Sequence, residues 1–139
     1  KPTLRQSLGD FLSSSKSGDF IALNAFIARN KENESRMQIL RKFLTEQTGL
    51  PTTLGFGPRF LHSTGQIHKG GANNGLFLQI TSDPIRDVAF DDMTFGILER
   101  AQALGDFESL VARNRRILRL HLPQSEVVAV LERLTASLV

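Results

Sequence analysis

Residues 19–28 read DFIALNAFIA, and after Asp19 the only polar side chain in this run is Asn24. A strand with one face in water alternates apolar and polar residues, and this run does not. Near-continuous apolar runs are typical of strands that are covered on both faces of a parallel sheet. The run therefore predicts a buried parallel strand with helices on both sides of its sheet.

The flanking sequence supplies helices of the right kind. Leu4, Leu8 and Phe11 recur at helical spacing before Gly18. After the run, apolar residues at helical spacing predict a helix ending near Thr48, with Asn33 as its N-cap and Gly49 as its C-cap.

Three more strands and three more helices follow in alternation. The strands are expected at 51–56, 75–81 and 115–122, the last at a sheet edge because apolar and basic residues partly alternate there. The helices are expected from Pro58, over 94–114 with Thr94 as N-cap and a break near Gly105-Asp106, and after a Ser125 cap; 83–92 is expected to be a loop. This order predicts an α/β fold, a three-layer αβα sandwich with a mostly parallel sheet.

Composition limits the class of protein. The 139 residues, 40% of them apolar, fit a single domain over 1–139. No apolar run is long enough for a membrane span, no signal peptide is visible, and there is no cysteine, so we expect a cytoplasmic protein. The chain begins at Lys1 rather than Met, and we expect it to belong to a longer protein.

The charge pattern disfavours nucleic acid as a partner. The net charge is only +3, Trp and Tyr are absent, and the arginines gather in 112–122. Nucleic-acid binders usually have a denser basic face with aromatic residues for stacking. A small anion such as a sugar phosphate fits this charge better.

Polar chemistry concentrates in residues 57–71, GPRFLHSTGQIHKGG, which hold two of the three histidines. One interpretation of this stretch is a solvated loop that connects two elements of the fold. His62 and His68 lie on different helix faces with no acidic residue near them, which argues against a metal site, and the glycines match no phosphate loop. Proton transfer by histidine is better supported, with Arg59 and Lys69 available to hold an anion.

The stretch GFGPRFLHSTGQIHKGG (55–71) resembles the glucose-6-phosphate isomerase family, most of all the isomerase part of bacterial transaldolase–isomerase fusion proteins. The similarity continues through NNGLFLQIT, MTFGILERAQALGDFESL and RRILRLHLP, so it covers most of the chain. It implies a sugar-isomerase (SIS)-like fold and interconversion of glucose 6-phosphate and fructose 6-phosphate, with no cofactor and no metal.

In that family the histidine of this motif assists sugar ring opening, and it corresponds to His62. The resemblance also implies substrate contacts from Arg59, Ser63, Gln66 and Lys69, with Gln66 on the same helix face as His62. His68 and Lys69 are expected either to touch substrate or to be the solvated end of a helix.

The chain departs from the family in two places. The family's base is a glutamate, for which EQTGL (46–50) is a loose match; Glu46 is more simply an exposed helix-end residue. The segment with the family's ring-opening lysine is absent. The resemblance therefore implies a C-terminal subdomain of a longer enzyme, which needs the rest of the isomerase chain and a homodimer partner.

Two further expectations concern the remaining basic residues. His121 is expected to be structural, hydrogen-bonded near a strand end. Arg113, Arg115 and Arg116 are expected to be a solvated face or to pair with the rest of the enzyme. A second hypothesis for the whole chain is a non-catalytic phosphosugar-binding module.

Overall fold

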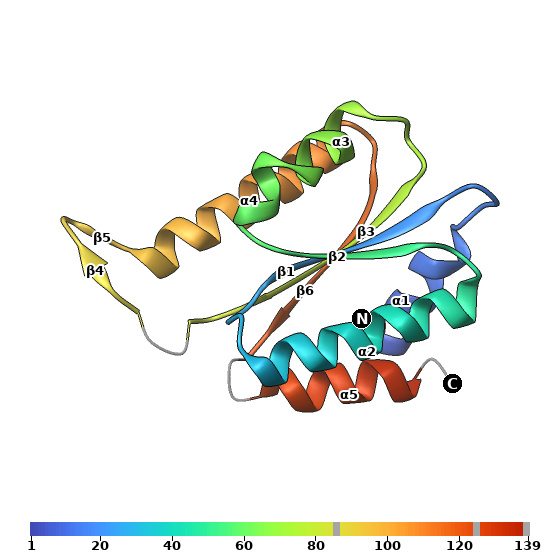
Figure 1. Cartoon of the computed structure of the whole chain (residues 1–139), viewed down its shortest axis with the longest axis horizontal. Helices are drawn as coiled ribbons and strands as arrows, with labels where there is room; N and C mark the ends of the chain where they lie inside the picture. The colour runs from blue at the N-terminus through green and yellow to red at the C-terminus, as the bar shows by residue number, and fades with distance from the viewer. Residues whose placement is uncertain (85–86, 124–125, 138–139) are drawn as a thin grey trace.

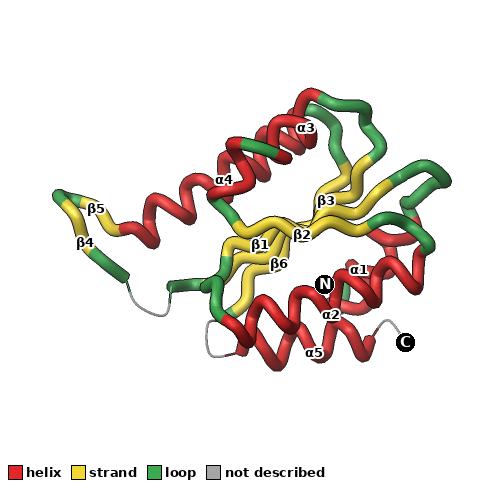
Figure 2. Tube along the Cα trace, in the orientation of Figure 1, coloured by secondary structure: helices red, strands yellow, loops and turns green. Residues whose placement is uncertain are grey.

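Four parallel strands form the central sheet in the computed structural model, which describes residues 1–84, 87–123 and 126–137. The strand order is β2-β1-β3-β6 (Figures 1 and 2), with bounds β1 Phe20–Phe26, β2 Thr52–Phe56, β3 Gly75–Ser82 and β6 Arg116–Leu122. The apolar run at 19–28 contains the inner strand β1, and the predicted edge strand is β6. The three-layer αβα sandwich with a parallel sheet is confirmed.

The helices divide between the two faces of the sheet, as Figure 1 shows. One face is covered by α1 Leu4–Ser13, α2 Lys31–Thr48 and α5 Val127–Ser137. The other is covered by α3 Thr64–Gly70 and α4 Phe95–Ala112, and the short 3₁₀ helix η1, Arg59–His62, precedes α3. No helix in the described part of the chain is long and apolar enough to cross a membrane.

The face toward α2 and α5 holds the main apolar core. Alternate residues of β1 and β3 point into it, among them Leu23 and Leu78, which are fully buried. Each such side chain contributes about 1.5–3 kcal/mol of transfer free energy, an upper estimate because unfolded chains also bury some surface. This layer supplies most of the hydrophobic stabilisation of the fold.

The opposite face of the sheet is partly polar. Asn24, Gln79 and Arg119 are register partners on three neighbouring strands, beneath the layer of α3 and α4. Gln79 and Asn24 are buried, and Gln79 Nε2 donates to the carbonyl of Ala103 in α4 at 2.9 Å. Apolar packing on this side is limited to two small clusters, such as that of Ala22, Phe77 and Leu110.

The N-cap of α2 is Asn30, not Asn33 as predicted. Asn30 Oδ1 accepts from the backbone N–H of Asn33 at 2.8 Å, while the Asn33 side chain donates back to the carbonyl of Ala28. A cap side chain accepts from the backbone N–H near the third helical residue. Asn33 is at that position and donates this N–H, so Asn30 is the cap. Gly49 is the left-handed C-cap, as expected, with φ 70°.

Helix α4 is continuous through Gly105-Asp106, so the predicted break is wrong. Asp106 is buried and pairs with Lys69 of α3, and this tertiary contact offsets the low helix propensity of the neighbouring glycine. Thr94 caps the helix as predicted, with its Oγ1 accepting from the Ile97 N–H at 3.1 Å.

Two other local expectations need correction. The segment 83–92, predicted to be a loop, contains β4 Ala89–Phe90, which pairs antiparallel with β5 Met93–Thr94 directly after the segment. The predicted helix from Pro58 is divided into η1 and α3, because Ser63 between them has non-helical dihedrals (φ −135°, ψ −101°). The predicted cap Ser125 lies outside the described residues.

Candidate functional site

The candidate site lies where β2 ends. The chain leaves Phe56 at the carboxyl edge of the sheet and continues into η1 and α3, so the motif stretch occupies the position expected of a ligand-binding segment. An open groove of about 350 Å³ borders it, between η1 and the beginning of α2. Three apolar side chains, Leu54, Phe56 and Phe60, form its walls.

Arg59, Ser63 and Thr64 reach this groove from the motif. Arg59 is exposed and has no hydrogen-bond partner among the described residues. The Ser63 hydroxyl donates to the carbonyl of Phe60 at 3.3 Å, which leaves its lone pairs available. The backbone of His62 ends η1 at the rim of this region, while its side chain lies outside what the structure describes.

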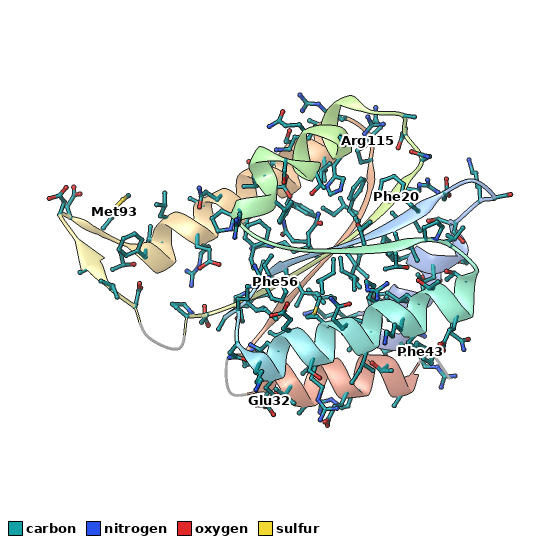
Figure 3. The ribbon with its side chains drawn as sticks, in the orientation of Figure 1. Phe20, Glu32, Phe43, Phe56, Met93 and Arg115 are labelled. Atoms are coloured by element: carbon teal, nitrogen blue, oxygen red, sulfur yellow. The ribbon has the colours of Figure 1, made fainter. Side chains whose placement is uncertain are left out.

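Sequence reasoning missed the residues that the other side of the groove supplies. Arg29 follows β1 at the same edge; its guanidinium lies 5.2 Å from the centre of the Phe56 ring (labelled in Figure 3) and 3.6 Å from Glu34. Gln38 follows on α2. The signal was available in the position of Arg29, directly after the carboxyl end of the predicted strand.

Gln66 does not lie on one helix with His62, contrary to the expectation. The break at Ser63 separates η1 from α3, and Gln66 Nε2 donates to the carbonyl of Leu61 at 3.1 Å. Gln66 therefore braces the end of η1, and its exposed amide oxygen is the group left for other partners.

Lys69 points away from the groove. Its ammonium lies 3.2 Å from Asp106 Oδ1 of α4, whose side chain is only 2% exposed. Burial raises the pKa of the Asp106 carboxyl, while the hydrogen bond and charge of Lys69 act in the opposite direction. Lys69 holds α3 on α4 and is not among the residues that line the groove.

His68 is buried, so its interpretation as the solvated end of a helix is wrong, and it is not among the residues that line the groove. Its ring packs among Phe20, Phe60 and Phe77, with its centre 4.8 Å from that of Phe77. Burial, and secondarily the charge of Lys69, lowers the pKa of this imidazole. The spacing of Gly65 and His68, both buried on one face of α3, was the available signal.

The buried His68 predicts acid sensitivity of the fold. Its pKa is lower in the folded chain than the ordinary value of 6.5, so below about pH 6.5 the unfolded chain binds more protons and stability falls with falling pH. One such group changes the unfolding free energy by at most about 1.4 kcal/mol per pH unit. Urea unfolding at pH 5 and 7.5 should show that His68→Phe reduces this loss.

His121→Gln is the matched control, since that ring is half exposed. The loss in His68→Phe is compared with that in His121→Gln, so that replacing a histidine as such is separated from replacing the buried one. An unchanged dependence in His68→Phe would contradict the assignment of the acid sensitivity to His68.

Glu46 lies at the far edge of the sheet from the motif. It is exposed in the last turn of α2, which leads into the beginning of β2, whereas η1 follows the end of β2. The interpretation as an exposed helix-end glutamate is confirmed, and Glu46 cannot reach the groove of its own chain.

His121 has the structural contacts that were expected. Its Nδ1 is 2.8 Å from Thr81 Oγ1 on the neighbouring strand, and its Nε2 is 3.5 Å from Asp83 Oδ1. Asp83 also binds Arg100 of α4 at 2.8 Å. These contacts fix the ends of β3 and β6 to the beginning of α4.

The arginine cluster is only partly the solvated face that was expected: Arg115 and Arg116 are half-buried in contacts within the chain, whereas Arg113 is exposed. Arg115 (labelled in Figure 3) donates to the carbonyls of Lys69 and Gly71, and Arg116 binds Asp19 at 2.8 Å. Arg113 binds Ser109. Arg116, through its hydrogen bond, lowers the pKa of Asp19.

In the part of the chain that is described, no three His, Asp or Glu side chains form a group that could hold a metal ion.

Comparisons with known proteins support the fold alone. No protein-family model and no curated protein matches this sequence. Among solved structures, a hypothetical protein from Thermus thermophilus matches 97% of this chain with a TM-score of 0.79 and 17% identity. A de novo designed Rossmann fold protein matches 84% of the chain and 97% of its own, with 13% identity and a TM-score of 0.44. The chain spans 37% of the length of the Thermus chain.

Proposed function

We propose that this chain is the C-terminal subdomain of an enzyme that interconverts glucose 6-phosphate and fructose 6-phosphate, with His62 as the group that opens the sugar ring. The observation that supports this most directly is the position of the motif stretch. It borders an open groove at the carboxyl edge of the sheet, with Arg29 on one side and Arg59 on the other.

The groove has the groups that a phosphorylated hexose requires. The guanidinium groups of Arg29 and Arg59 suit a phosphate, since planar N–H donors pair with phosphate oxygens. The hydroxyls of Ser63 and Thr64 can bind sugar hydroxyls, and the aromatic walls can pack on the ring. Glu34 pairs with Arg29 and would turn from it when an anion enters.

Ring opening is the step assigned to this chain. The anomeric hydroxyl loses its proton, the bond between C1 and the ring oxygen breaks, and the ring oxygen takes a proton. An imidazole that titrates near neutrality can serve both transfers. We propose that the carboxylate for the later proton transfer between C1 and C2 comes from outside this chain, because Glu46 lies at the opposite edge of the sheet and Glu34, beside the groove, pairs with Arg29.

His62→Ala in the full-length protein tests the assignment. Turnover of the cyclic sugar phosphate should fall about 100-fold, the lower range for loss of a general acid–base group. With substrate supplied in its open-chain form, which has no ring to open, the loss should be much smaller. His121→Ala, whose ring lies outside the groove, is the matched control and should retain turnover. Equal losses with both substrate forms would contradict a ring-opening role.

A second candidate function is phosphosugar binding without catalysis. The groove is formed entirely by residues of this chain, including both arginines. This hypothesis expects calorimetric binding of glucose 6-phosphate to the 139-residue chain, weakened by Arg59→Ala and by added salt. Retained isomerase turnover in the His62→Ala protein, together with such binding, would favour this candidate over the first.

A further inference from the structure

The adjacent strands β1 and β3 send the chain to opposite faces of the sheet. After β1 the chain enters α2 and returns as the neighbouring strand β2, whereas after β3 it enters α4 on the other face and returns as β6 (Figure 1). Where adjacent parallel strands diverge in this way, the carboxyl edge of the sheet opens into a crevice, which is the usual position of a ligand in such folds. The topology therefore directs attention to the ends of β1 and β3.

A crevice with two parts is present at this position. The outer part, of about 270 Å³, lies between residues 26–28 at the end of β1 and residues 82–84 at the end of β3. The inner part, of about 20 Å³, lies between α4 and the ends of β3 and β6, and Glu99 of α4 lines both parts. We call the two parts together the switch-point crevice. It shares no lining residue with the groove beside the motif stretch.

Several polar side chains that line the switch-point crevice are already paired within the fold. Asp83 binds Arg100 at 2.8 Å. His121 contacts both Asp83, at 3.5 Å, and Thr81, at 2.8 Å. Because these four side chains satisfy one another, they hold the walls of the crevice together and are not the groups that a ligand would find unpaired.

Two opposite charges in the crevice have no hydrogen-bond or ion-pair partner among the described residues. Glu99 is half-buried, and burial raises the pKa of its carboxyl. Arg119 of β6 is also half-buried; its Nε is buried without a hydrogen bond, and its guanidinium lies 6.0 Å from the centre of the Phe107 ring. Charges that are withdrawn from water without a counter-ion destabilise a fold, and they are typical of binding sites.

We propose that the switch-point crevice binds an α-amino acid with a small apolar side chain. The ligand carboxylate enters the small inner part and binds Arg119, whose planar N–H groups match carboxylate oxygens. The ligand ammonium group binds Glu99 where the two parts meet, and the ligand side chain lies in the outer part against Phe26 and Pro84.

The pair of unpaired charges selects this class of ligand over others. An amine without a carboxylate would leave Arg119 uncompensated, and a carboxylate without an amine would leave Glu99 uncompensated. A sugar phosphate would place its negative charge in the same crevice as the carboxylate of Glu99. The inner part is also too small for a whole ligand, so the ligand needs a small charged end. The assignment does not depend on the proposed function, because the two sites are separate.

Three probes that differ by one charged group test the recognition. They are L-valine, 3-methylbutanoate, which lacks the ammonium group, and 2-methylpropylamine, which lacks the carboxylate. In calorimetry with the 139-residue chain, L-valine should bind with a dissociation constant of about 1 mM or below. Its affinity should be at least tenfold higher than that of either analogue, because each analogue leaves one charge of the crevice unpaired.

Substitutions then assign each charge to its group on the ligand. Glu99→Gln should weaken the binding of L-valine at least tenfold and should not weaken that of 3-methylbutanoate, whereas Arg119→Gln should weaken both. Glu108→Gln, at an exposed position on α4, and Arg5→Gln, at an exposed position on α1, are the matched controls and should leave the affinity for L-valine unchanged. Urea unfolding of each variant checks that the fold is retained.

The comparison of probes and the Glu99→Gln variant decide the outcome even if Arg119→Gln does not fold. An absence of binding at millimolar L-valine would overturn the proposal. So would an affinity for L-valine no higher than for its two analogues, or one that Glu99→Gln and Glu108→Gln change equally.

Discussion

Replacing Lys69 by methionine should lower the free energy of unfolding by about 3–5 kcal/mol near neutral pH, as expected when a buried charge loses its partner. The carboxylate of Asp106 is 2% exposed and its Oδ2 has no hydrogen-bond partner among the described residues. Without the ammonium 3.2 Å away, this charge would have no compensation inside the fold. Methionine keeps the length of the lysine stem, so lost packing contributes little.

The cost of Lys69→Met should decrease as the pH falls. Burial raises the pKa of Asp106, and Lys69 partly opposes that rise. In the variant the folded chain takes up a proton at higher pH than the unfolded chain, so its relative stability improves as the pH falls toward 3.8. Urea unfolding of both proteins at pH 7.5 and 4.5 measures this.

Two variants separate the buried charge from other effects. Lys69→Met combined with Asp106→Leu should recover to within about 1 kcal/mol of the wild type, because no buried charge remains. Lys42→Met, at an exposed position on α2, should change stability by less than about 0.5 kcal/mol. A loss below about 1 kcal/mol in Lys69→Met at pH 7.5 would show that Asp106 does not depend on Lys69.

This ion pair marks the limit of what the sequence could predict. The fold class could be predicted from local patterns. A short apolar run without alternation is typical of a parallel strand covered on both faces, and the run at 19–28 does contain such a strand, β1. The partners Lys69 and Asp106 lie far apart in the sequence, and no local pattern relates them. A polar residue beside a glycine usually indicates a turn, so Gly105-Asp106 was expected to break the helix that it continues.

The solvent-exposed interpretations of His68, Arg115 and Arg116 were wrong for the same reason. Such side chains are usually exposed, and no local pattern shows the contacts that bury these three. Three phenylalanines from different segments enclose His68, and carbonyls at the end of α3 bind Arg115. The sequence predicted only the motif side of the candidate groove, which follows β2. Arg29 lies beside it because β1 and β2 are parallel neighbours, so the residues after both strands are at the same edge of the sheet.

Leu78→Ala should be the most damaging substitution in the apolar core, with a loss of about 2–5 kcal/mol in the free energy of unfolding. Leu78 is fully buried on β3, between β1 and β6, and faces the layer of α2 and α5. Side chains of both the sheet and these helices surround Leu78, so its loss would leave a cavity at the centre of the main core. Ile39→Ala on the exposed surface of α2 should lose less than about 1 kcal/mol.

The next residue along β3 should respond differently, because it faces the other layer. Gln79 donates to the carbonyl of Ala103, but its Oε1 is buried without a partner among the described residues. Gln79→Leu removes that unsatisfied oxygen and one hydrogen bond together, so the two effects should nearly cancel, within about 1 kcal/mol. Equal losses for Leu78→Ala and Gln79→Leu in urea unfolding would mean that both faces of the sheet stabilise the fold by the same apolar packing, contrary to the polar row of Asn24, Gln79 and Arg119.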